Sequence, residues 1–416
     1  MGTDVRIRNL SDGKTTERRN RMSRIRVAHI ITRLITGGAD ENTVLTVEGL
    51  DPARYKVTLF AGGPSEEEMI SRVRTAEFVS VPNLQRELRP VKDLRAFVEL
   101  ARILKSEKYD LVHTHEAKAG ILGRLAAKCA GTPVVVHTLH GITFHRHLPL
   151  PLRLLYLYLE KLTARFTDVF ICVGEDLRRT YLASGVGRPE QYRVVRSGFD
   201  VSRFVRAASD RGKFREKLRK QLNLPENVTI VGTVARLEPR KGVQFLIEAA
   251  SKLCPRWPRL HFTVAGRGDY RPALEKLVAE RGLQNRFYFV GFVDRVEEYL
   301  AGLDLFALSS LWEGLPRALV QAGIVGLPVV TFDVEGAWEV VKEGKTGYIV
   351  PSRDVDSLVA RLDFLLSNPR LAERMGREAQ RGLAEEWRAE KMVQEIEAIY
   401  RELLETKTRE TPDDLD

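Results

Sequence analysis

The sequence predicts an α/β protein built from two doubly wound domains. Its 416 residues are enough for two hydrophobic cores, because a single core seldom grows beyond about 250 to 300 residues. Short β-branched runs alternate with helical patterns in two successive series, which indicates parallel sheets covered by helices. A content of 44% hydrophobic and 29% charged residues is typical of a globular chain. No apolar run approaches the roughly 18 residues of a membrane-spanning helix.

The predicted strands follow in chain order, and each precedes a turn and a helical pattern. In the first series they are 26–31, 56–60, 111–113, 134–138 and 169–173. In the second series they are 229–235, 261–265, 287–290, 304–308 and 329–332. Apolar residues at helical spacing predict two further helices, at 354–366 and 390–404.

These elements divide the chain into five predicted parts. An Arg-rich polar tail at 1–24 lacks the apolar core of a secretory signal, and we expect it to be disordered. A first Rossmann-like domain is expected at 25–200 and a second one at 201–385. A helix at 386–405 and a polar tail at 406–416 follow.

Charge and cysteine content restrict the partners and the compartment. Residues 1–200 hold 32 Lys or Arg and 23 Asp or Glu, a net +9 of the chain's +10. Such a basic half suits phosphates or an anionic membrane surface. No basic cluster is interleaved with aromatic residues, so we expect no nucleic-acid partner. Cys129, Cys172 and Cys254 are widely spaced, which argues against a zinc site or disulfides and favours the cytoplasm.

The stretch 309–330 carries the most specific pattern in the chain. After the predicted buried strand, Pro316 suits the first turn of a helix, where its missing N–H is not needed. Glu313, Gly314 and Leu315 form the turn before it, and Gln321 follows within the helix. Backbone N–H groups at such a helix start suit an anion or a hydroxyl-rich group.

Two other strand ends in the second series carry candidate binding residues. Arg236 and Lys241 follow strand 229–235 beside a helix start, an arrangement that suits a diphosphate. A solvated basic turn is the alternative. The turn from Gly266 to Gly268 follows strand 261–265 and has room for a nucleobase or ribose, although a GxG pattern alone is unspecific.

The first series contributes a second group of candidates. Gly37 and Gly38 follow the first strand and would let the backbone approach a ligand closely, though such a pair is also a common turn. His140 follows strand 134–138. His115 and Lys118 follow strand 111–113, and they either contact an acceptor or pack at the strand end.

Histidines crowd this half of the chain and raise the alternative of a metal site. His137, His140, His145 and His147 fall within eleven residues, but acidic partners are missing nearby. We therefore expect no metal. His137 and His113 are expected to be packed strand residues, while His145 and His147 line an acceptor surface or face solvent.

One short run resembles the donor-site signature of retaining glycosyltransferases of family 4. It consists of Glu313, Gly314, any residue and Pro316, with a polar residue eight positions after the glutamate. That family has a second glutamate where this chain has Gln321. The resemblance extends over residues 25 to about 404. It implies the GT-B fold, in which two doubly wound domains face an interdomain cleft that binds the substrates. The resemblance assigns the acceptor to the domain at 25–200 and the donor to the domain at 201–385. It also implies that the helix at 386–405 crosses back to the first domain.

The resemblance also implies roles for the candidate residues. Arg236 and Lys241 hold the donor diphosphate, Glu313 orients the sugar, Gln321 accepts a hydrogen bond from the ribose, and His140 lies by the reacting carbon and the acceptor. Further donor contacts are implied for Gly37, Gly38, Gly266, Gly268, Val290, Gly314, Leu315 and Pro316. No metal or other cofactor is implied.

The implied activity is the transfer of a sugar from a nucleotide-diphosphate sugar with retention of its anomeric configuration, and UDP is favoured over GDP as the nucleotide. The implied acceptor is a saccharide or a lipid-linked acceptor in envelope polysaccharide or glycolipid assembly. A UDP-sugar epimerase of the same architecture and a non-catalytic sugar-nucleotide-binding protein are the alternatives. The Leu- and Tyr-rich stretch 147–165 either packs on the first sheet or contacts an anionic membrane surface. The protein is expected in the cytoplasm, at the inner face of the membrane when bound.

Overall fold

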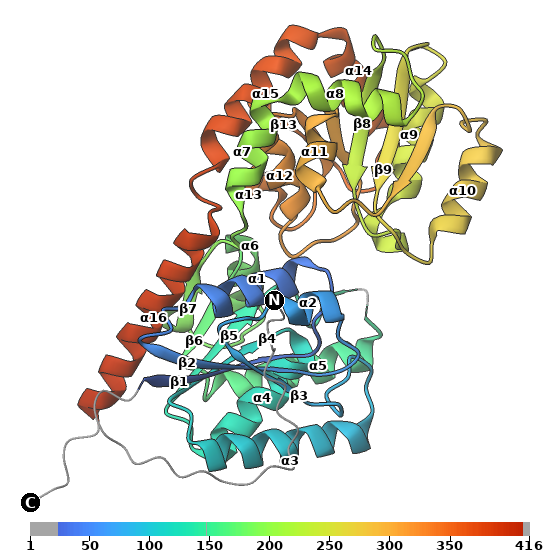
Figure 1. Ribbon diagram of the computed structural model, residues 1–416. Coiled ribbons are helices and arrows are strands. Elements are labelled where there is room, and N and C mark those ends of the chain that lie inside the picture. Colours follow the sequence, from blue (N-terminus) through green and yellow to red (C-terminus); the bar gives the residue numbers. More distant parts are fainter. Residues whose placement is uncertain (1–23, 147, 411–416) are drawn as a thin grey trace, which may run out of the picture. The chain divides into compact units, whose positions relative to one another are not determined.

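The computed structural model describes residues 24–146 and 148–410, which form two compact units (Figure 1). Unit 1 comprises the chain up to Phe199 together with the residues from Ala389 onward, and unit 2 comprises Asp200–Arg388. The predicted basic tail lies outside the described residues except for Arg24. No helix within the described ranges is long and apolar enough to cross a membrane.

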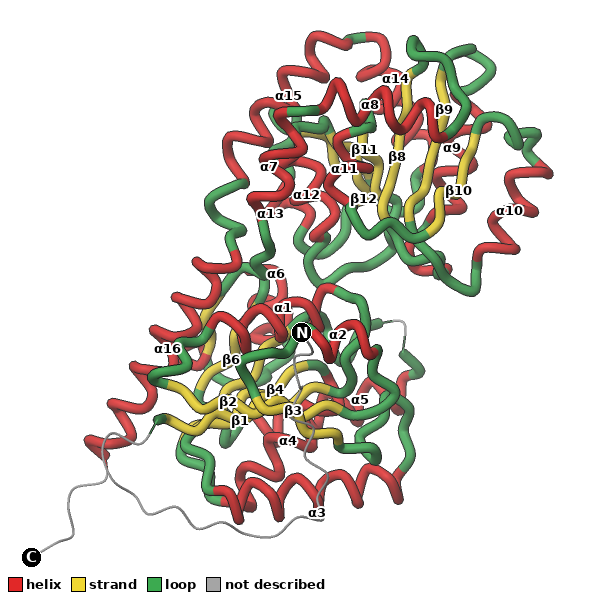
Figure 2. The backbone as a smooth tube through the Cα atoms, in the orientation of Figure 1, coloured by secondary structure: helices red, strands yellow, loops and turns green. Residues whose placement is uncertain are grey.

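Unit 1 is built on one parallel sheet of seven strands in the order β3-β2-β1-β4-β5-β6-β7. Figure 2 shows these strands as one layer with helices around it. The strands are β1 Ile25–Ile31, β2 Tyr55–Ala61, β3 Glu77–Ser80, β4 Leu111–His115, β5 Val134–Leu139, β6 Val169–Cys172 and β7 Tyr192–Val194. The helices are α1 Gly38–Gly49, α2 Glu67–Ser71, α3 Pro90–Glu107, α4 Ala117–Ala130, α5 Leu150–Ala164, α6 Glu175–Ala183 and α16 Ala389–Glu410, with a 3-10 turn at Pro189–Gln191.

Alternation along β1 divides the core of unit 1 between the two faces of the sheet. Val27 and Ile31 join an apolar cluster with residues of α1 and α16. Ala28 and Ile30, which point the other way, join a cluster with residues of α3 and α4. The strand is therefore buried on both faces, as expected for the centre of a parallel sheet.

The C-terminal helix α16 supplies part of this core. Met392, Ile396 and Tyr400 are each at most 2% exposed and belong to the cluster that includes α1. The helix predicted at 386–405 is observed at Ala389–Glu410, so it begins three residues later and ends five residues later than predicted. The residues after 405 are mostly good helix formers, and the hydroxyl of Thr408 donates to the carbonyl of Leu404 one turn earlier, 2.8 Å away.

Unit 2 has a parallel sheet of six strands in the order β10-β9-β8-β11-β12-β13. The strands are β8 Thr229–Val234, β9 Leu260–Ala265, β10 Phe287–Gly291, β11 Leu305–Leu308, β12 Val329–Phe332 and β13 Gly347–Val350. The helices are α7 Val201–Ser209, α8 Arg211–Gln221, α9 Val243–Leu253, α10 Arg271–Glu280, α11 Val296–Ala301, α12 Arg317–Val325, α13 Ala337–Val340, α14 Val355–Ser367 and α15 Pro369–Leu383, with a 3-10 turn at Pro239–Lys241. The fold class is therefore α/β with two doubly wound sheets, as predicted.

The predicted strands occur within two residues of their expected bounds, and the three missed strands lie at sheet edges. These are β3 and β7 in unit 1 and β13 in unit 2. Each has only three or four residues. Edge strands need less apolar sequence than central strands, so their pattern is weaker.

Candidate functional site

In unit 2, the loops that follow two neighbouring strands hold each other at the carboxyl edge of the sheet. Strand β8 pairs with β11. The Leu311 N–H donates to the carbonyl of Arg240 at 2.8 Å, and the Ser309 hydroxyl donates to the carbonyl of Gly242 at 2.8 Å. A Cβ on Gly242 would lie only 1.7 Å from the Ser309 carbonyl oxygen. This contact therefore requires glycine and fixes the basic loop against the loop that carries Glu313.

The clearest feature of this edge is an ion pair between two of the predicted site residues. Lys241 Nζ lies 2.6 Å from Glu313 Oε1, and the two side chains are only 16% and 11% exposed. The Glu313 N–H donates to the carboxylate of Glu335 at 3.3 Å. Lys241 and Glu313, 72 residues apart in sequence, thus form one shielded unit of fixed geometry.

Arg236 lies in the same basic turn and also has a carboxylate neighbour. Its guanidinium is 3.8 Å from Glu238 Oε1, and the other Glu238 oxygen accepts a hydrogen bond from Arg240 Nε at 2.8 Å. These three side chains are each about one-third exposed. Arg236, Arg240 and Lys241 give the turn an excess of positive charge that remains accessible to an anion.

The glycines at 266 and 268 allow three strand ends to approach one another. A Cβ on Gly266 would lie 1.9 Å from the carbonyl oxygen of Ala235, and one on Gly268 would lie 2.3 Å from that of Leu237. The Gly266 N–H donates to the Gly291 carbonyl at 2.7 Å, next to Val290 at the end of β10. The predicted residues 236, 266, 268 and 290 therefore follow adjacent strands at one edge.

Helix α12 begins one residue later than predicted. Pro316 directly precedes its first residue, Arg317, a difference within the usual uncertainty of helix ends. Leu315 and Pro316 are buried, Gly314 is half-buried, and Gln321 is a half-buried residue of the helix. A Cβ on Gly336 would lie 2.8 Å from Leu315 Cδ1, so this turn packs closely on the loop after β12.

In unit 1, the two predicted glycines lie at the start of α1. Gly37 caps the helix and Gly38 is its first residue. Asp40 in the first turn accepts a hydrogen bond from the Ile35 N–H at 3.0 Å. Because a carboxylate already occupies this helix start, the site favours a hydroxyl-rich group over a second anion.

His140 contacts His115 rather than lying alone after its strand. His115 Nδ1 is 3.3 Å from His140 Nε2, and the rings are stacked with centroids 5.6 Å apart. His115 is fully buried, whereas His140 is half-buried. Burial holds the pKa of His115 well below its usual range, and neighbouring histidines lower it further, so this ring is neutral.

Lys118 is held inside unit 1 by two acceptors, one in the first turn of α3 and one in the segment before that helix. Its ammonium pairs with Asp93 at 2.8 Å and also donates to the backbone carbonyl of Glu87. The side chain is only 7% exposed. In this structure Lys118 connects α4 to α3.

Glu116 is a candidate that the sequence analysis missed. It precedes α4 with φ of 61° and ψ of 173°, a backbone conformation that costs a non-glycine residue on the order of 1 to 3 kcal/mol. The pKa of its carboxyl is raised to about 7. Burial is the largest cause, the nearby Asp40 adds to the shift, and a hydrogen bond with Thr32 opposes it. The available signal was its position directly after a strand at the same edge as Gly37.

The other candidate histidines of unit 1 are buried or half-buried where the structure describes them. His137 is buried in β5, and its Nδ1 is 2.8 Å from the Thr114 hydroxyl, which confirms the expectation of a packed strand residue. His113 is also fully buried in β4. His145 is half-buried, and His147 lies outside the described residues. Within the described ranges the group of three close potential metal ligands is His29, His113 and His115.

Comparisons with known proteins agree with the fold. The family described as "Glycosyltransferase Family 4" matches residues 36–203, and "Glycosyl transferases group 1" matches residues 214–382. The chain is thus an enzyme of the glycosyltransferase class with the GT-B fold. It belongs to the family 4 type of these glycosyltransferases.

Individual relatives cover nearly the whole chain. An Escherichia coli protein named UDP-Gal:alpha-D-GlcNAc-diphosphoundecaprenol alpha-1,3-galactosyltransferase is 29% identical over 92% of this chain and 99% of its own length. The putative glycosyltransferase EpsD of Bacillus subtilis is 28% identical over 77% of this chain and 83% of its own. The crystal structure of HepE from Anabaena in complex with UDP has a TM-score of 0.74 at 22% identity, and covers 91% of this chain and all of that one.

Proposed function

We propose that this enzyme transfers a sugar from a UDP-sugar to a lipid-linked saccharide, with retention of anomeric configuration and without a metal. The observation that carries the proposal is the Lys241–Glu313 pair beside Arg236 at the carboxyl edge of unit 2. The E. coli relative supports a lipid-diphosphate-linked acceptor. The HepE structures with UDP and with UDP-glucose support UDP as the nucleotide.

In the proposed mechanism unit 2 binds the donor. The guanidinium of Arg236 and the ammonium of Lys241 bind the diphosphate and stabilise the negative charge that develops as the sugar–oxygen bond breaks. Glu313, held by Lys241, orients the sugar through its hydroxyl groups. A new bond forms from the acceptor oxygen to the same face of the sugar carbon, and the acceptor proton moves to the departing phosphate oxygen.

Gln321 is proposed to contact the ribose with reduced strength. Its amide oxygen accepts a hydrogen bond from a ribose hydroxyl, as a carboxylate would. The bond lacks the assistance of a charge, so we expect a loss of about 1 kcal/mol or less in donor affinity compared with a glutamate. This substitution is compatible with an active enzyme.

The direct test is incubation with candidate UDP-sugars, with and without an undecaprenyl-diphosphate-linked saccharide, in the presence of a chelator. We expect a glycosylated lipid product whose new linkage keeps the anomeric configuration of the donor, as determined by NMR. Conversion of the sugar nucleotide without an acceptor would indicate the epimerase instead. Donor binding without any product from a panel of acceptors would favour a non-catalytic binding protein.

We further propose that unit 1 binds an anionic membrane surface through α3 and α5. The exposed large apolar side chains of α3 and of the turn before it are Leu88, Val91, Leu94 and Val98, and those of α5 are Leu150, Leu154, Leu155 and Tyr158. Both α3 and α5 pack against α4. The alternative of an α5 fully packed on the sheet does not account for these exposed residues.

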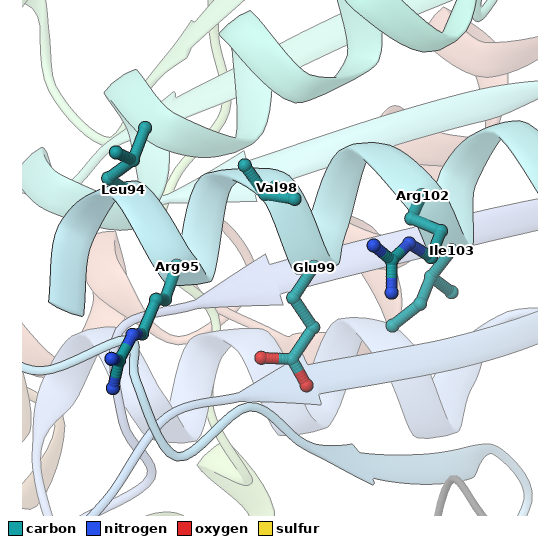
Figure 3. A pocket seen from close by; sticks show the side chains of 6 residues that line it. All are labelled: Leu94, Arg95, Val98, Glu99, Arg102 and Ile103. Carbon is teal, nitrogen blue, oxygen red and sulfur yellow. The ribbon is translucent and has the colours of Figure 1, made fainter. Parts of the chain in front are cut away.

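Basic side chains accompany this apolar face. A hollow along α3 is lined by Leu94, Arg95, Val98, Glu99, Arg102 and Ile103 (Figure 3), and Arg153 is exposed on α5. An apolar face flanked by arginines fits a surface of anionic lipid headgroups. This membrane would present the lipid-linked acceptor.

Co-sedimentation with vesicles containing anionic lipid tests the membrane proposal. Changing Leu150 and Leu154 to serine should lower the bound fraction several-fold, and neutralising Arg146 and Arg153, together with deletion of 1–24, should lower it further. Phe364→Ser, at an exposed apolar site of unit 2, is the control and should have no effect. Equal sedimentation of all variants would exclude this surface.

A further inference from the structure

A chain of five hydrogen bonds, four of them buried, connects the C-terminal helix of unit 1 to His140. Thr138 Oγ1 is 2.6 Å from His113 Nε2, and His113 Nδ1 is 2.5 Å from the Tyr400 hydroxyl. That hydroxyl is 3.2 Å from His29 Nε2. His29 Nδ1 is 3.0 Å from His115 Nε2, and His115 Nδ1 is 3.3 Å from His140 Nε2.

The interior members of this chain are neutral. His29, His113 and His115 are fully buried. Burial lowers the pKa of His29 to about 3 and the pKa of His113 and of His115 well below the usual value. Burial likewise raises the pKa of Tyr400 well above its usual value. Each imidazole therefore has one N–H donor and one acceptor nitrogen, and Tyr400 has one O–H donor.

Both nitrogens of each interior ring are engaged, so two arrangements of the hydrogens remain in which the Tyr400 hydroxyl also donates within the chain. A Tyr400 oxygen that accepted from both His113 and His29 would leave its own buried hydrogen without an acceptor in the chain, which is unfavourable. In one arrangement every donor points toward His140, whose Nε2 then accepts and whose proton is on Nδ1. In the other arrangement every donor points away, and His140 carries its proton on Nε2.

Thr138 distinguishes the two arrangements. When the donors point toward His140, the Thr138 hydroxyl donates to His113 Nε2. When they point away, that hydroxyl must accept from His113, and its own hydrogen finds no other acceptor among the described residues. Thr138 is only 2% exposed, and a buried donor without a partner is unfavourable. The first arrangement is therefore favoured.

We infer that Thr138, His113, Tyr400, His29 and His115 are positioning residues that hold His140 in its Nδ1-protonated tautomer. His140 then presents a ring N–H donor rather than a lone pair at Nδ1. In the proposed reaction such a donor suits a hydroxyl or carbonyl oxygen of the substrate. This last step rests on the proposed function, whereas the tautomer follows from the fold of unit 1 alone.

The geometry distinguishes positioning from proton transport. The far end of the chain is the buried Thr138 hydroxyl, and no titratable group follows it within the described residues. A proton passed inward from His140 would reach no group in the chain that could release it. The chain therefore orders hydrogens without conducting a proton.

Matched variants that remove one hydroxyl each test the inference. Tyr400→Phe and Thr138→Val break the chain at two points while keeping the shape of the side chain. Tyr55→Phe is the control, because Tyr55 packs edge-on against Tyr400 with ring centroids 6.2 Å apart and its hydroxyl finds no partner among the described residues. Circular dichroism and thermal unfolding confirm that each variant folds.

The measurement is long-range proton–nitrogen correlation NMR of the full chain labelled with nitrogen-15 in its 8 histidines, with His140 assigned by His140→Gln. We expect Nδ1 protonation of His140 in the parent and in Tyr55→Phe, and a shift toward Nε2 protonation in Tyr400→Phe and Thr138→Val. Unchanged His140 signals in both chain-breaking variants would overturn the inference.

Two further readouts separate the explanations. With an active acceptor, kcat should fall about tenfold in Tyr400→Phe with an unchanged KM for the donor. A shifted His140 tautomer with an unchanged kcat would contradict the role of His140 in the reaction, but not the inferred tautomer of the parent. Added Co²⁺ should produce no visible absorption bands. Tight binding with such bands would identify His29, His113 and His115, whose ligand atoms lie within 4.8 Å of one another, as a metal site and would overturn the chain.

Discussion

At the scale of single residues, the central feature is that Lys241 and Glu313 form one shielded pair. Replacing Lys241 by alanine removes a proposed diphosphate ligand and leaves the Glu313 carboxylate without its cation. We expect a 10²- to 10³-fold loss of kcat. Gln321→Glu, which adds the charge that family 4 has there, should change turnover less than tenfold. Steady-state kinetics of both variants measure this; similar losses would contradict the assignment of Lys241 to the phosphates.

Glu116 predicts a pH dependence of stability. Its folded-state pKa, about 7, is above the value of an unfolded glutamate, so the folded state binds the proton more tightly. The stabilisation is fully present below about pH 4.5 and is lost as pH rises through 7. Urea unfolding at pH 5 and pH 8 should show Glu116→Gln gaining on the order of 1 to 2 kcal/mol relative to the parent at the higher pH. The same difference at both pH values would contradict the raised pKa.

Among single residues, those that directly follow a strand could be predicted from sequence. Arg236, Lys241 and Glu313 follow strands with clear apolar patterns, and the carboxyl ends of parallel strands share an edge. The contacts of His140 could not be predicted in this way. They depend on His29 and on Tyr400, which is 371 residues from His29 in sequence and is brought there by tertiary packing.

At the scale of elements, α16 is a structural part of unit 1. Ile396 is 2% exposed within the cluster that includes α1. Ile396→Ala should therefore lower the free energy of unfolding by about 2 to 5 kcal/mol. Gln394→Ala, at an exposed position of the same helix, should change it by less than about 0.5 kcal/mol. Chemical denaturation compares the two, and equal effects would mean that α16 does not contribute to this core.

A buried ion pair fixes α5 against α4. Arg124 and Glu160 are both fully buried, and their charged groups are 2.7 Å apart. Glu160→Ala leaves a buried guanidinium uncompensated and should destabilise the protein by about 3 to 5 kcal/mol. The double variant Arg124→Met, Glu160→Leu should recover most of that loss, because both charges are removed. A double variant as unstable as Glu160→Ala would show that packing, not charge, dominates here.

The ends of elements were harder to predict than their existence. The end of α16 was placed too early because a polar sequence was taken for a tail, whereas exposed helix formers and threonine side chains continue the helix. Pro316 was placed within α12, although the helix begins at Arg317. Such ends depend on local hydrogen bonds that periodicity does not reveal.

At the scale of the whole molecule, the doubly wound architecture of both units could be predicted because central parallel strands are buried on both faces and read as apolar runs. The short edge strands could not. The Glu313 signature, together with the order of the other motifs, indicated a family 4 glycosyltransferase before any comparison. The nature of the acceptor is not encoded in any such motif, and the proposed membrane contact of unit 1 depends on which α3 and α5 residues are exposed.

The measurement that tests the central claim most directly is calorimetric titration of the purified chain with UDP and with GDP in the presence of a chelator. The account predicts that UDP binds more tightly than GDP without metal, and that Lys241→Ala loses this binding while Tyr55→Phe retains it. Binding of neither nucleotide, or equal binding by Lys241→Ala, would contradict a metal-independent donor site at Arg236, Lys241 and Glu313.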